Sequence, residues 1–238
     1  TPVISSAASD VYKRQKIGLE KISEALGNWK APDDWYKRAI KEKNEWDAYV
    51  EKQSGPTNQE EPSYAHAVGA VYRNSDPSDI VVTAAGGLVG EVVQVWKPKQ
   101  LNTFETEWGF SCMGYEISGA LGIKMAKPDQ DVVVFVGDGS YLLNNTDIYS
   151  SVIYDQKLII IVCDNGGHMV INRLQLAKGG KEYICNLRAA RATNLKFVDF
   201  ENHAKSMGAN AETVSSTSEL EAAYKSCLLY TSDAADEI

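Results

Sequence analysis

The chain has 238 residues, a hydrophobic fraction of 44% and a formal net charge of −8. This length allows one large α/β domain, or one domain and part of a second, with a buried core. The acidic balance argues against a nucleic-acid surface, which needs clustered Lys and Arg, and no apolar run approaches the roughly 18 residues of a membrane-spanning helix. We therefore expect neither a nucleic-acid nor a membrane partner, and any anionic ligand must be held by a metal ion or by backbone amides.

The two ends of the chain read as foreign sequence. Residues 5–15 (SSAASDVYKRQ) and 227–237 (CLLYTSDAADE) back-translate into DNA strings that are reverse complements of each other, read one base out of phase. We interpret residues 1–15 and 227–238 as translated sequencing adapters and exclude them from the fold prediction; two natural tails are the alternative. The cysteines between them, Cys112, Cys163 and Cys185, have no paired spacing, which is typical of a reducing cytoplasm.

The predicted elements begin with a charged segment at residues 16–62, interpreted as a helical linker from a preceding domain. Its helix, residues 33–53, begins behind Pro32 with acidic residues in the first turn, and Gly and Pro then mark a connection. Residues 63–226 are predicted to form one domain. Its expected helices are residues 63–72, 114–125, 142–154, 199–207 and 218–225, the last with Ser218 and Glu221 at capping-box spacing, and its expected strands are residues 80–84, 131–136, 158–163 and 211–214.

Two of these strands decide the fold class. Residues 131–136 and 158–163 are continuous apolar runs rich in Val and Ile, which is typical of parallel strands covered on both faces. The alternation of strands and helices around them predicts an α/β fold, a doubly wound parallel sheet with helices on both faces.

The residues that carry chemistry follow these two strands. The sequence GDGS comes after the first and DNGG after the second, so Asp138 and Asn165 are expected beyond the same edge of the sheet, where ligands of open parallel sheets bind. A carboxylate and an amide oxygen are hard ligands that suit Mg²⁺ or Ca²⁺. The pattern therefore predicts a metal site at this edge.

The residues around Asp138 suit a phosphate group. Gly137 and Gly139 let the backbone approach a ligand closely, and the amides of Gly139 and Ser140 can donate to it. The tripeptide Gly-Asp-Gly also occurs as an ordinary turn. Its position after a buried strand, with an Asn-containing turn after the next strand, favours the functional interpretation.

This pattern resembles the diphosphate-binding signature of thiamine-diphosphate enzymes, in which GDG is followed by Asn about two dozen residues later. The resemblance implies that Asp138 and Asn165 are side-chain ligands of Mg²⁺ and that the Gly167 carbonyl is the third ligand that the protein supplies. It also implies that Met113, in GFSCMG, wedges under the cofactor; filling of the core is the alternative role for this side chain. Gly86 and Gly87, after the first strand, are weaker cofactor-binding candidates.

Longer strings narrow the resemblance within this superfamily. DIVVTAAGGLVGE, EWGFSCMGYEISGALGIKMA, VGDGSYLLNNTDIYSS and INRLQLAKGG resemble the trihydroxycyclohexane-1,2-dione hydrolases of inositol catabolism. The resemblance implies a hydrolase that cleaves a C–C bond of a small polyhydroxylated cyclic diketone and opens it to a deoxy-uronic acid, with the cofactor as electron sink. One departure is His168, where relatives usually have an aromatic or apolar residue. For His168, a contact with substrate and a loop position without a role are the two alternatives, and we assign no function to His66 or His203.

The catalytic glutamate of the superfamily lies in a separate pyrimidine-binding domain, so we expect no catalytic residue within this chain and a fragment that is inactive alone. We interpret Glu105, Glu107 and Glu116 as solvated or structural acids. The family further implies a homodimer or homotetramer of the full-length protein. Two alternatives stay open: an acetolactate-synthase-like carboligase or decarboxylase, which would lack the INRLQ-type loop, and a non-catalytic module that binds Mg²⁺ and a diphosphate.

Overall fold

The computed structural model describes residues 14–191, 194 and 197–229. These residues belong to two compact units with a boundary between Ala48 and Tyr49, inside helix α3 (Asp33–Ser54). The first unit contains helix α2 (Gln15–Leu26) and most of α3. Among the described residues, no helix combines the length and the apolar character that crossing a membrane requires.

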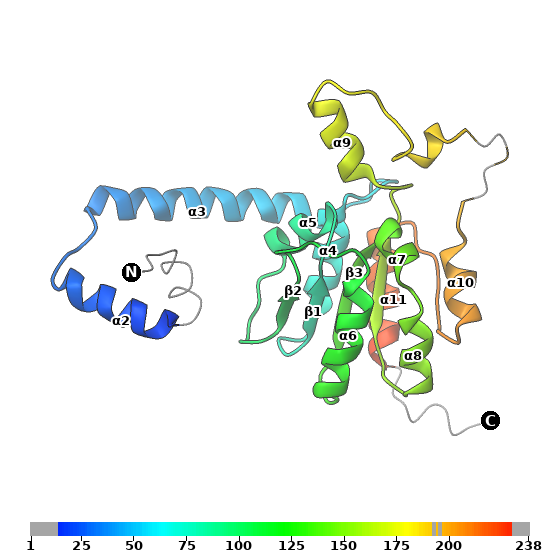
Figure 1. Cartoon of the computed structure of the whole chain (residues 1–238), viewed down its shortest axis with the longest axis horizontal. Helices are drawn as coiled ribbons and strands as arrows, with labels where there is room; N and C mark the ends of the chain where they lie inside the picture. Colours follow the sequence, from blue (N-terminus) through cyan, green and yellow to red (C-terminus); the bar gives the residue numbers. More distant parts are fainter. Residues whose placement is uncertain (1–13, 192–193, 195–196, 230–238) are drawn as a thin grey trace, which may run out of the picture. The chain divides into compact units, whose positions relative to one another are not determined.

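The second unit is built on a four-stranded, fully parallel sheet with the strand order β2-β1-β3-β4. Its strands are β1 (Ile80–Thr83), β2 (Phe104–Thr106), β3 (Val132–Gly137) and β4 (Ile159–Cys163). The register pairs Val82 with Val134 and Phe135 with Ile161. Because β1 and β3 are apolar and buried on both faces, the sheet lies between two helical layers, as Figure 1 shows.

Most helices of the second unit fill these two layers, and α9 (Met169–Ala177) lies beyond the edge of the sheet. In chain order the helices are α4 (Tyr64–Asn74), α5 (Leu88–Val95), α6 (Tyr115–Ala126), α7 (Asp138–Leu143), α8 (Asp147–Ile153), α9, α10 (Phe200–Ser206) and α11 (Thr217–Leu229). On one face Val81 and Val133 pack under α4, α5 and α11, and on the other Val82 and Val134 pack under α6 to α8. The predicted doubly wound α/β class is confirmed.

The crossover between β3 and β4 differs from the single helix expected over residues 142–154. It consists of two helices, α7 and α8, separated by residues 144–146. The Asn144 side chain donates to the Ser118 hydroxyl (2.8 Å) and to the Gly114 carbonyl (3.3 Å). Because this amide bonds to the neighbouring helix α6, it favours a break in the chain at Asn144 over a continuous helix.

Two expectations near the C-terminus are wrong. Residues 211–214 form no strand, because the Thr213 amide donates to the Glu201 carboxylate (2.8 Å) instead of to β4. The capping box of α11 lies at Ser216 and Glu219, each accepting from the other's backbone amide at 3.2 Å. Glu221, expected in that role, pairs with Arg73 at 2.8 Å.

The C-terminal helix also extends beyond the predicted domain end at residue 226. Its last turn includes Cys227 and Leu228, which are partly buried against the core cluster under α4 and α5. Apolar contacts with the core thus continue the helix into the segment interpreted as adapter-derived. At the other end α2 begins at Gln15, and the rest of both predicted tails, residues 1–13 and 230–238, lies outside the described residues.

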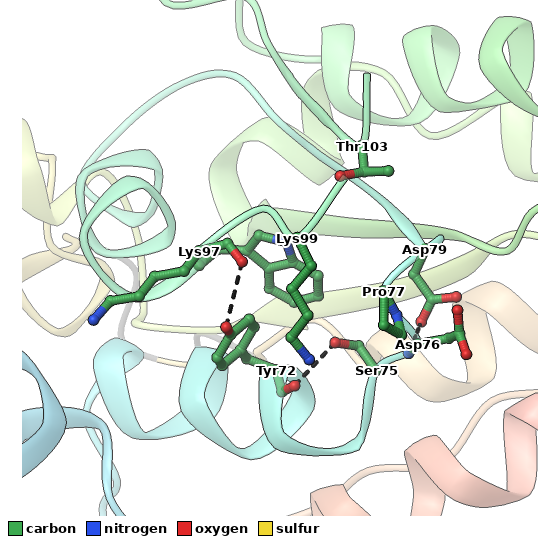
Figure 2. A pocket seen from close by; sticks show the side chains of 9 residues that line it. Tyr72, Ser75, Asp76, Pro77, Asp79, Lys97, Lys99 and Thr103 are labelled. Atoms are coloured by element: carbon green, nitrogen blue, oxygen red, sulfur yellow. Dashed lines mark hydrogen bonds between the residues drawn. The ribbon is translucent and has the colours of Figure 1, made fainter. Parts of the chain in front are cut away.

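The opposite edge of the sheet, where the strands begin, carries a small cavity of about 10 Å³ bordered by Tyr72, Asp76, Asp79 and Lys99. Figure 2 shows these side chains. A volume of this size accommodates about one water molecule and excludes an organic ligand. This edge is therefore not a candidate for a cofactor site.

Candidate functional site

The candidate residues gather at the carboxyl ends of β1, β3 and β4. Because these strands are parallel neighbours, the turns that follow them meet at one edge of the sheet, beyond which α9 also lies (Figure 1). The turns carry Gly86 and Gly87 after β1, Asp138 to Ser140 after β3, and Asn165 to Gly167 after β4.

Asp138 is the buried anchor of this edge, with an exposed fraction of 3%. Its carboxylate accepts from the Gly167 amide at 2.7 Å, and a further hydrogen bond comes from the Gly139 backbone. Burial raises the pKa of Asp138 above its ordinary value, and the neighbouring Asp164 carboxylate raises it further. Two carboxylates in contact form a concentration of negative charge that a divalent cation would offset.

Asn165 is the second candidate ligand, and its amide nitrogen donates to the hydroxyl of Tyr64. This contact leaves the amide oxygen as the atom that can turn toward a cation. Burial raises the pKa of Tyr64 to about 12, and the charge of Asp138 contributes to this shift. Tyr64 was missed in the sequence because it reads as an ordinary first-turn residue of α4.

Gly167 has a conformation that no other residue adopts easily, with φ at +135°. A Cβ here would lie 2.4 Å from the Cys185 carbonyl oxygen, so the close approach of the two chains requires glycine. The Gly167 carbonyl accepts from the Met169 amide at 3.0 Å, and its second lone pair stays available. The three predicted metal ligands thus all offer oxygen, the donor that Mg²⁺ prefers.

Gly139 lies beneath two side chains. A Cβ at this position would come within 2.7 Å of the His168 ring and 3.5 Å of the Met113 methyl group. The structure therefore brings Met113 to the predicted cofactor edge, together with His168, for which the sequence left the role open. A Cβ on Gly137 would meet nothing within 4 Å, so sterics do not require glycine there.

Ser140 and the first-strand glycines have different neighbours. The Ser140 hydroxyl is buried and donates to Glu116 at 3.0 Å, so only its backbone amide can serve a ligand. Gly86 has φ at +80°, and a Cβ on Gly87 would lie 2.9 Å from the Arg173 guanidinium. The INRLQ string, expected as a loop, forms helix α9, which places Arg173 over this turn.

The three glutamates considered in the sequence occupy separate environments. Glu105 is exposed on β2. Glu107 accepts from the amides of Phe110 (3.0 Å) and Cys112 (2.8 Å), and these hydrogen bonds hold its pKa below the ordinary value. Glu116 is almost fully buried. Within the described part of the chain, no three His, Cys, Asp or Glu side chains converge on a metal site, so the candidate site depends on amide and carbonyl oxygens.

A large cavity of about 880 Å³ adjoins this edge of the sheet. Tyr64, Asp164, Asn165, Gly166 and Met169 are among the residues that line it. Its volume falls within the range of small-molecule and cofactor sites. The candidate ligand Asn165 thus borders a space large enough for an organic molecule.

Comparison with known proteins gives a consistent result. Residues 84–235, more than half of the chain, match the family described as "Thiamine pyrophosphate enzyme, C-terminal TPP binding domain". The 3D-(3,5/4)-trihydroxycyclohexane-1,2-dione hydrolase of Halalkalibacterium halodurans is 40% identical over 62% of this chain and 23% of its own length. The enzyme of the same name from Geobacillus thermodenitrificans is 32% identical over 91% of this chain and 38% of its own length. The chain thus spans well under half the length of these curated relatives.

A solved structure supports the fold assignment. The thiamine diphosphate-dependent 4-hydroxybenzoylformate decarboxylase of Rhodococcus jostii RHA1 superposes with a TM-score of 0.61 at 19% sequence identity. The match covers 73% of this chain and 32% of that protein. At this identity the likeness establishes the fold.

Proposed function

Because the chain belongs to the thiamine pyrophosphate enzyme family and contains its C-terminal TPP-binding domain, we propose that it holds the diphosphate of thiamine diphosphate through Mg²⁺. The metal ligands are the Asp138 carboxylate, the Asn165 amide oxygen and the Gly167 carbonyl. The observation that carries this proposal is the buried Asp138 carboxylate bonded to the Gly167 amide at 2.7 Å. This contact joins the ends of β3 and β4 at the position where the metal would bind.

Electrostatics support a metal in this role. The chain has a net charge of −8, and Asp138 has Asp164 as an anionic neighbour. A diphosphate would be repelled by these charges without a cation between them. The donor set of carboxylate, amide and carbonyl oxygens selects a hard divalent ion.

The remaining candidates would contact the cofactor itself. Gly139 and Ser140 would offer backbone amides to the diphosphate, beside Gly137 at the end of β3. Met113, over Gly139, would support the organic part, with Gly86 and Gly87 at its other side. When bound, the cofactor supplies an electron sink next to a substrate carbonyl. This chain's own residues bind and orient it.

The proposed activity of the full-length protein is hydrolysis of a C–C bond in a polyhydroxylated cyclic 1,2-diketone, as part of inositol degradation. The support is the name of the relatives, 3D-(3,5/4)-trihydroxycyclohexane-1,2-dione hydrolase, which are 32–40% identical to this chain. The INRLQ segment, which forms α9 over Gly87, favours this activity over acetolactate-synthase-like chemistry, whose enzymes we expect to lack the segment. A non-catalytic module that binds Mg²⁺ and a diphosphate is the candidate from another class.

The activating glutamate would come from a domain outside residues 63–226, and the full-length protein would be a homodimer or homotetramer. Cys112, Cys163 and Cys185 are free thiols, which suits the reducing cytoplasm that we propose as its location. The partners would be the small-molecule diketone and further copies of the same chain.

The decisive experiment replaces Asp138. Asp138→Ala removes the only buried carboxylate of the proposed ligand set, and we expect Mg²⁺-dependent binding of thiamine diphosphate to be lost while circular dichroism shows an intact fold. Calorimetric titration measures the affinity. Asp129→Ala, at an exposed position before β3, is the matched control. Unchanged affinity in the Asp138 variant would contradict the metal assignment.

A further inference from the structure

Glu116 is a buried carboxylate that the proposed site does not use. Its exposed fraction is 1%, and it takes part in none of the ion pairs formed within the described residues. One oxygen, Oε1, accepts from the Ala85 amide at 3.2 Å and from the Ser140 hydroxyl at 3.0 Å. The other, Oε2, accepts from the Gly114 amide at 2.9 Å. All the hydrogen bonds to this carboxylate come from neutral donors.

These donors belong to three different segments of the chain. Ala85 follows β1, Gly114 precedes α6, and Ser140 is in α7. A second contact closes the group, because the Gly114 amide also lies 3.2 Å from the Ser140 hydroxyl. Glu116 thus joins three donors that are 31, 2 and 24 positions away from it in sequence but adjacent to it in space.

An ionised side chain at this position is costly unless all its hydrogen bonds are made, and an apolar side chain would pack there without that cost. Besides Glu116, helix α6 buries the apolar Ile117, Ala120 and Leu121 and the charged Lys124, so most of its packing is made without a carboxylate. A carboxylate, unlike an apolar side chain, accepts hydrogen bonds, and these hold each donor N–H or O–H group in a fixed orientation.

Each anchored segment carries a candidate cofactor contact. Ala85 is followed by Gly86, whose φ is +80°, and Gly114, with φ at +95°, is preceded by Met113. Ser140 is preceded by Gly139, against which the Met113 methyl group packs. Asp138, in contrast, is held by the amides of Gly139 and Gly167 and makes no contact with Glu116 among these hydrogen bonds.

We propose that Glu116 is a positioning residue that fixes the turns carrying Gly86, Met113 and Gly139 relative to one another, and so shapes the surface that receives the organic part of the cofactor. This inference rests on the proposed function. Glu116 makes no hydrogen bond to Asp138, so this metal ligand does not depend on it. Two of the three anchored turns carry contacts to the organic part, Gly86 and Met113, whereas only the turn with Gly139 also offers amides to the diphosphate. The thiamine part of the ligand therefore depends on Glu116 more than the metal and diphosphate part does.

The test compares two ligands on the same chain. Glu116→Gln keeps the shape of the side chain but replaces one accepting oxygen by a donor, so it cannot accept from all three groups. Loss of one to two charge-assisted hydrogen bonds predicts about tenfold weaker binding of Mg²⁺-thiamine diphosphate. Binding of Mg²⁺-pyrophosphate, which lacks the organic part, should change by less than about twofold. Both affinities are measured by calorimetry.

Glu105→Gln removes the same charge at an exposed position of β2 and serves as the matched control, with both affinities unchanged. If Glu116→Gln fails to fold, Ser140→Ala replaces it, because this variant leaves the carboxylate with two donors and keeps the backbone amide of residue 140. Equal weakening of both ligands, or of neither, would overturn the positioning role while leaving the metal site intact. A wild-type chain that binds neither ligand would overturn the proposed function itself.

Discussion

At the scale of single residues, the least expected contact is the one between Asn165 and Tyr64. The Asn165 amide nitrogen donates to the Tyr64 hydroxyl, so a residue of α4 orients a candidate metal ligand that follows β4. Because the side-chain amide of Asn165 is planar, the hydrogen bond made by its nitrogen also fixes the direction of its oxygen. Tyr64 therefore supports the metal site from a distance of about a hundred positions in sequence.

Removing this hydroxyl gives a direct prediction. Tyr64→Phe leaves the ring in place but deprives the Asn165 amide of its acceptor, and we expect Mg²⁺-dependent binding of thiamine diphosphate to weaken by about three- to tenfold. Tyr72→Phe, on the same helix, removes a hydroxyl that bonds to the Lys97 carbonyl at 3.3 Å and should leave affinity unchanged. Equal affinities for both variants, measured by calorimetry, would refute a role for Tyr64.

A second residue-scale prediction concerns Asp79, at the opposite edge of the sheet (Figure 2). This carboxylate is 4% exposed and accepts from the Asp76 amide (2.8 Å) and the Tyr224 hydroxyl (3.1 Å). Burial raises its pKa above the ordinary value. Folding therefore takes up a proton once the pH exceeds the unfolded pKa of about 3.9, and the contribution of Asp79 to stability is lost as pH rises through the folded pKa.

Asp79→Asn tests this linkage. The amide oxygen can accept from both donors without a charge. As pH rises from about 4 toward 7, the free energy of unfolding of the wild type should therefore fall relative to that of the variant. Urea unfolding at several pH values measures both. Asp129→Asn, at an exposed position, is the control and should show no such trend. If the difference in unfolding free energy between wild type and Asp79→Asn did not change with pH, the raised pKa of Asp79 would be contradicted.

At the scale of elements, the sequence predicts best where a pattern is long and apolar. The runs in β3 and β4 and the small-residue helix α6 lie within one or two residues of their expected bounds. Helix α5 and strand β2 were not predicted. The α5 sequence, LVGEVVQV, is rich in Val and contains Gly90, so its local preference opposes the helix that core packing imposes.

The other errors have a common cause, which is a side chain that captures a distant backbone group. Asn144 interrupts the crossover helix by bonding to α6, and Glu201 takes the Thr213 amide that a fifth strand would need. The site shows the same limit. GDG and Asn165 could be recognised in the sequence. Tyr64, Arg173 and Glu116 reach their partners, Asn165, Gly87 and Ser140, only through folding, and no local sequence pattern marks these contacts.

At the scale of the whole molecule, the described domain carries the proposed metal and diphosphate site, and we expect the proton-transfer group elsewhere in the full-length protein. The edge formed by β1, β3 and β4 carries the metal and diphosphate candidates, and the adjoining cavity of about 880 Å³ provides space beside Asn165. Within the described residues, both buried carboxylates of this edge are engaged, because Glu116 accepts three hydrogen bonds and Asp138 is the metal ligand that we propose.

The last prediction follows from this division. We expect the 238-residue chain to fold and to bind Mg²⁺-thiamine diphosphate weakly, but to show no ring opening of a cyclic 1,2-diketone. Proton transfer by a positioned group is typically worth about 10²–10⁴-fold in rate, and we propose that this group comes from another domain of the full-length protein. A chain shortened to end at Leu229, which keeps the whole of α11, should behave identically. The assay follows diketone loss, with the full-length Geobacillus thermodenitrificans relative as positive control. Ring opening by the 238-residue chain at a rate comparable to that of the control would place the missing proton-transfer group within these residues.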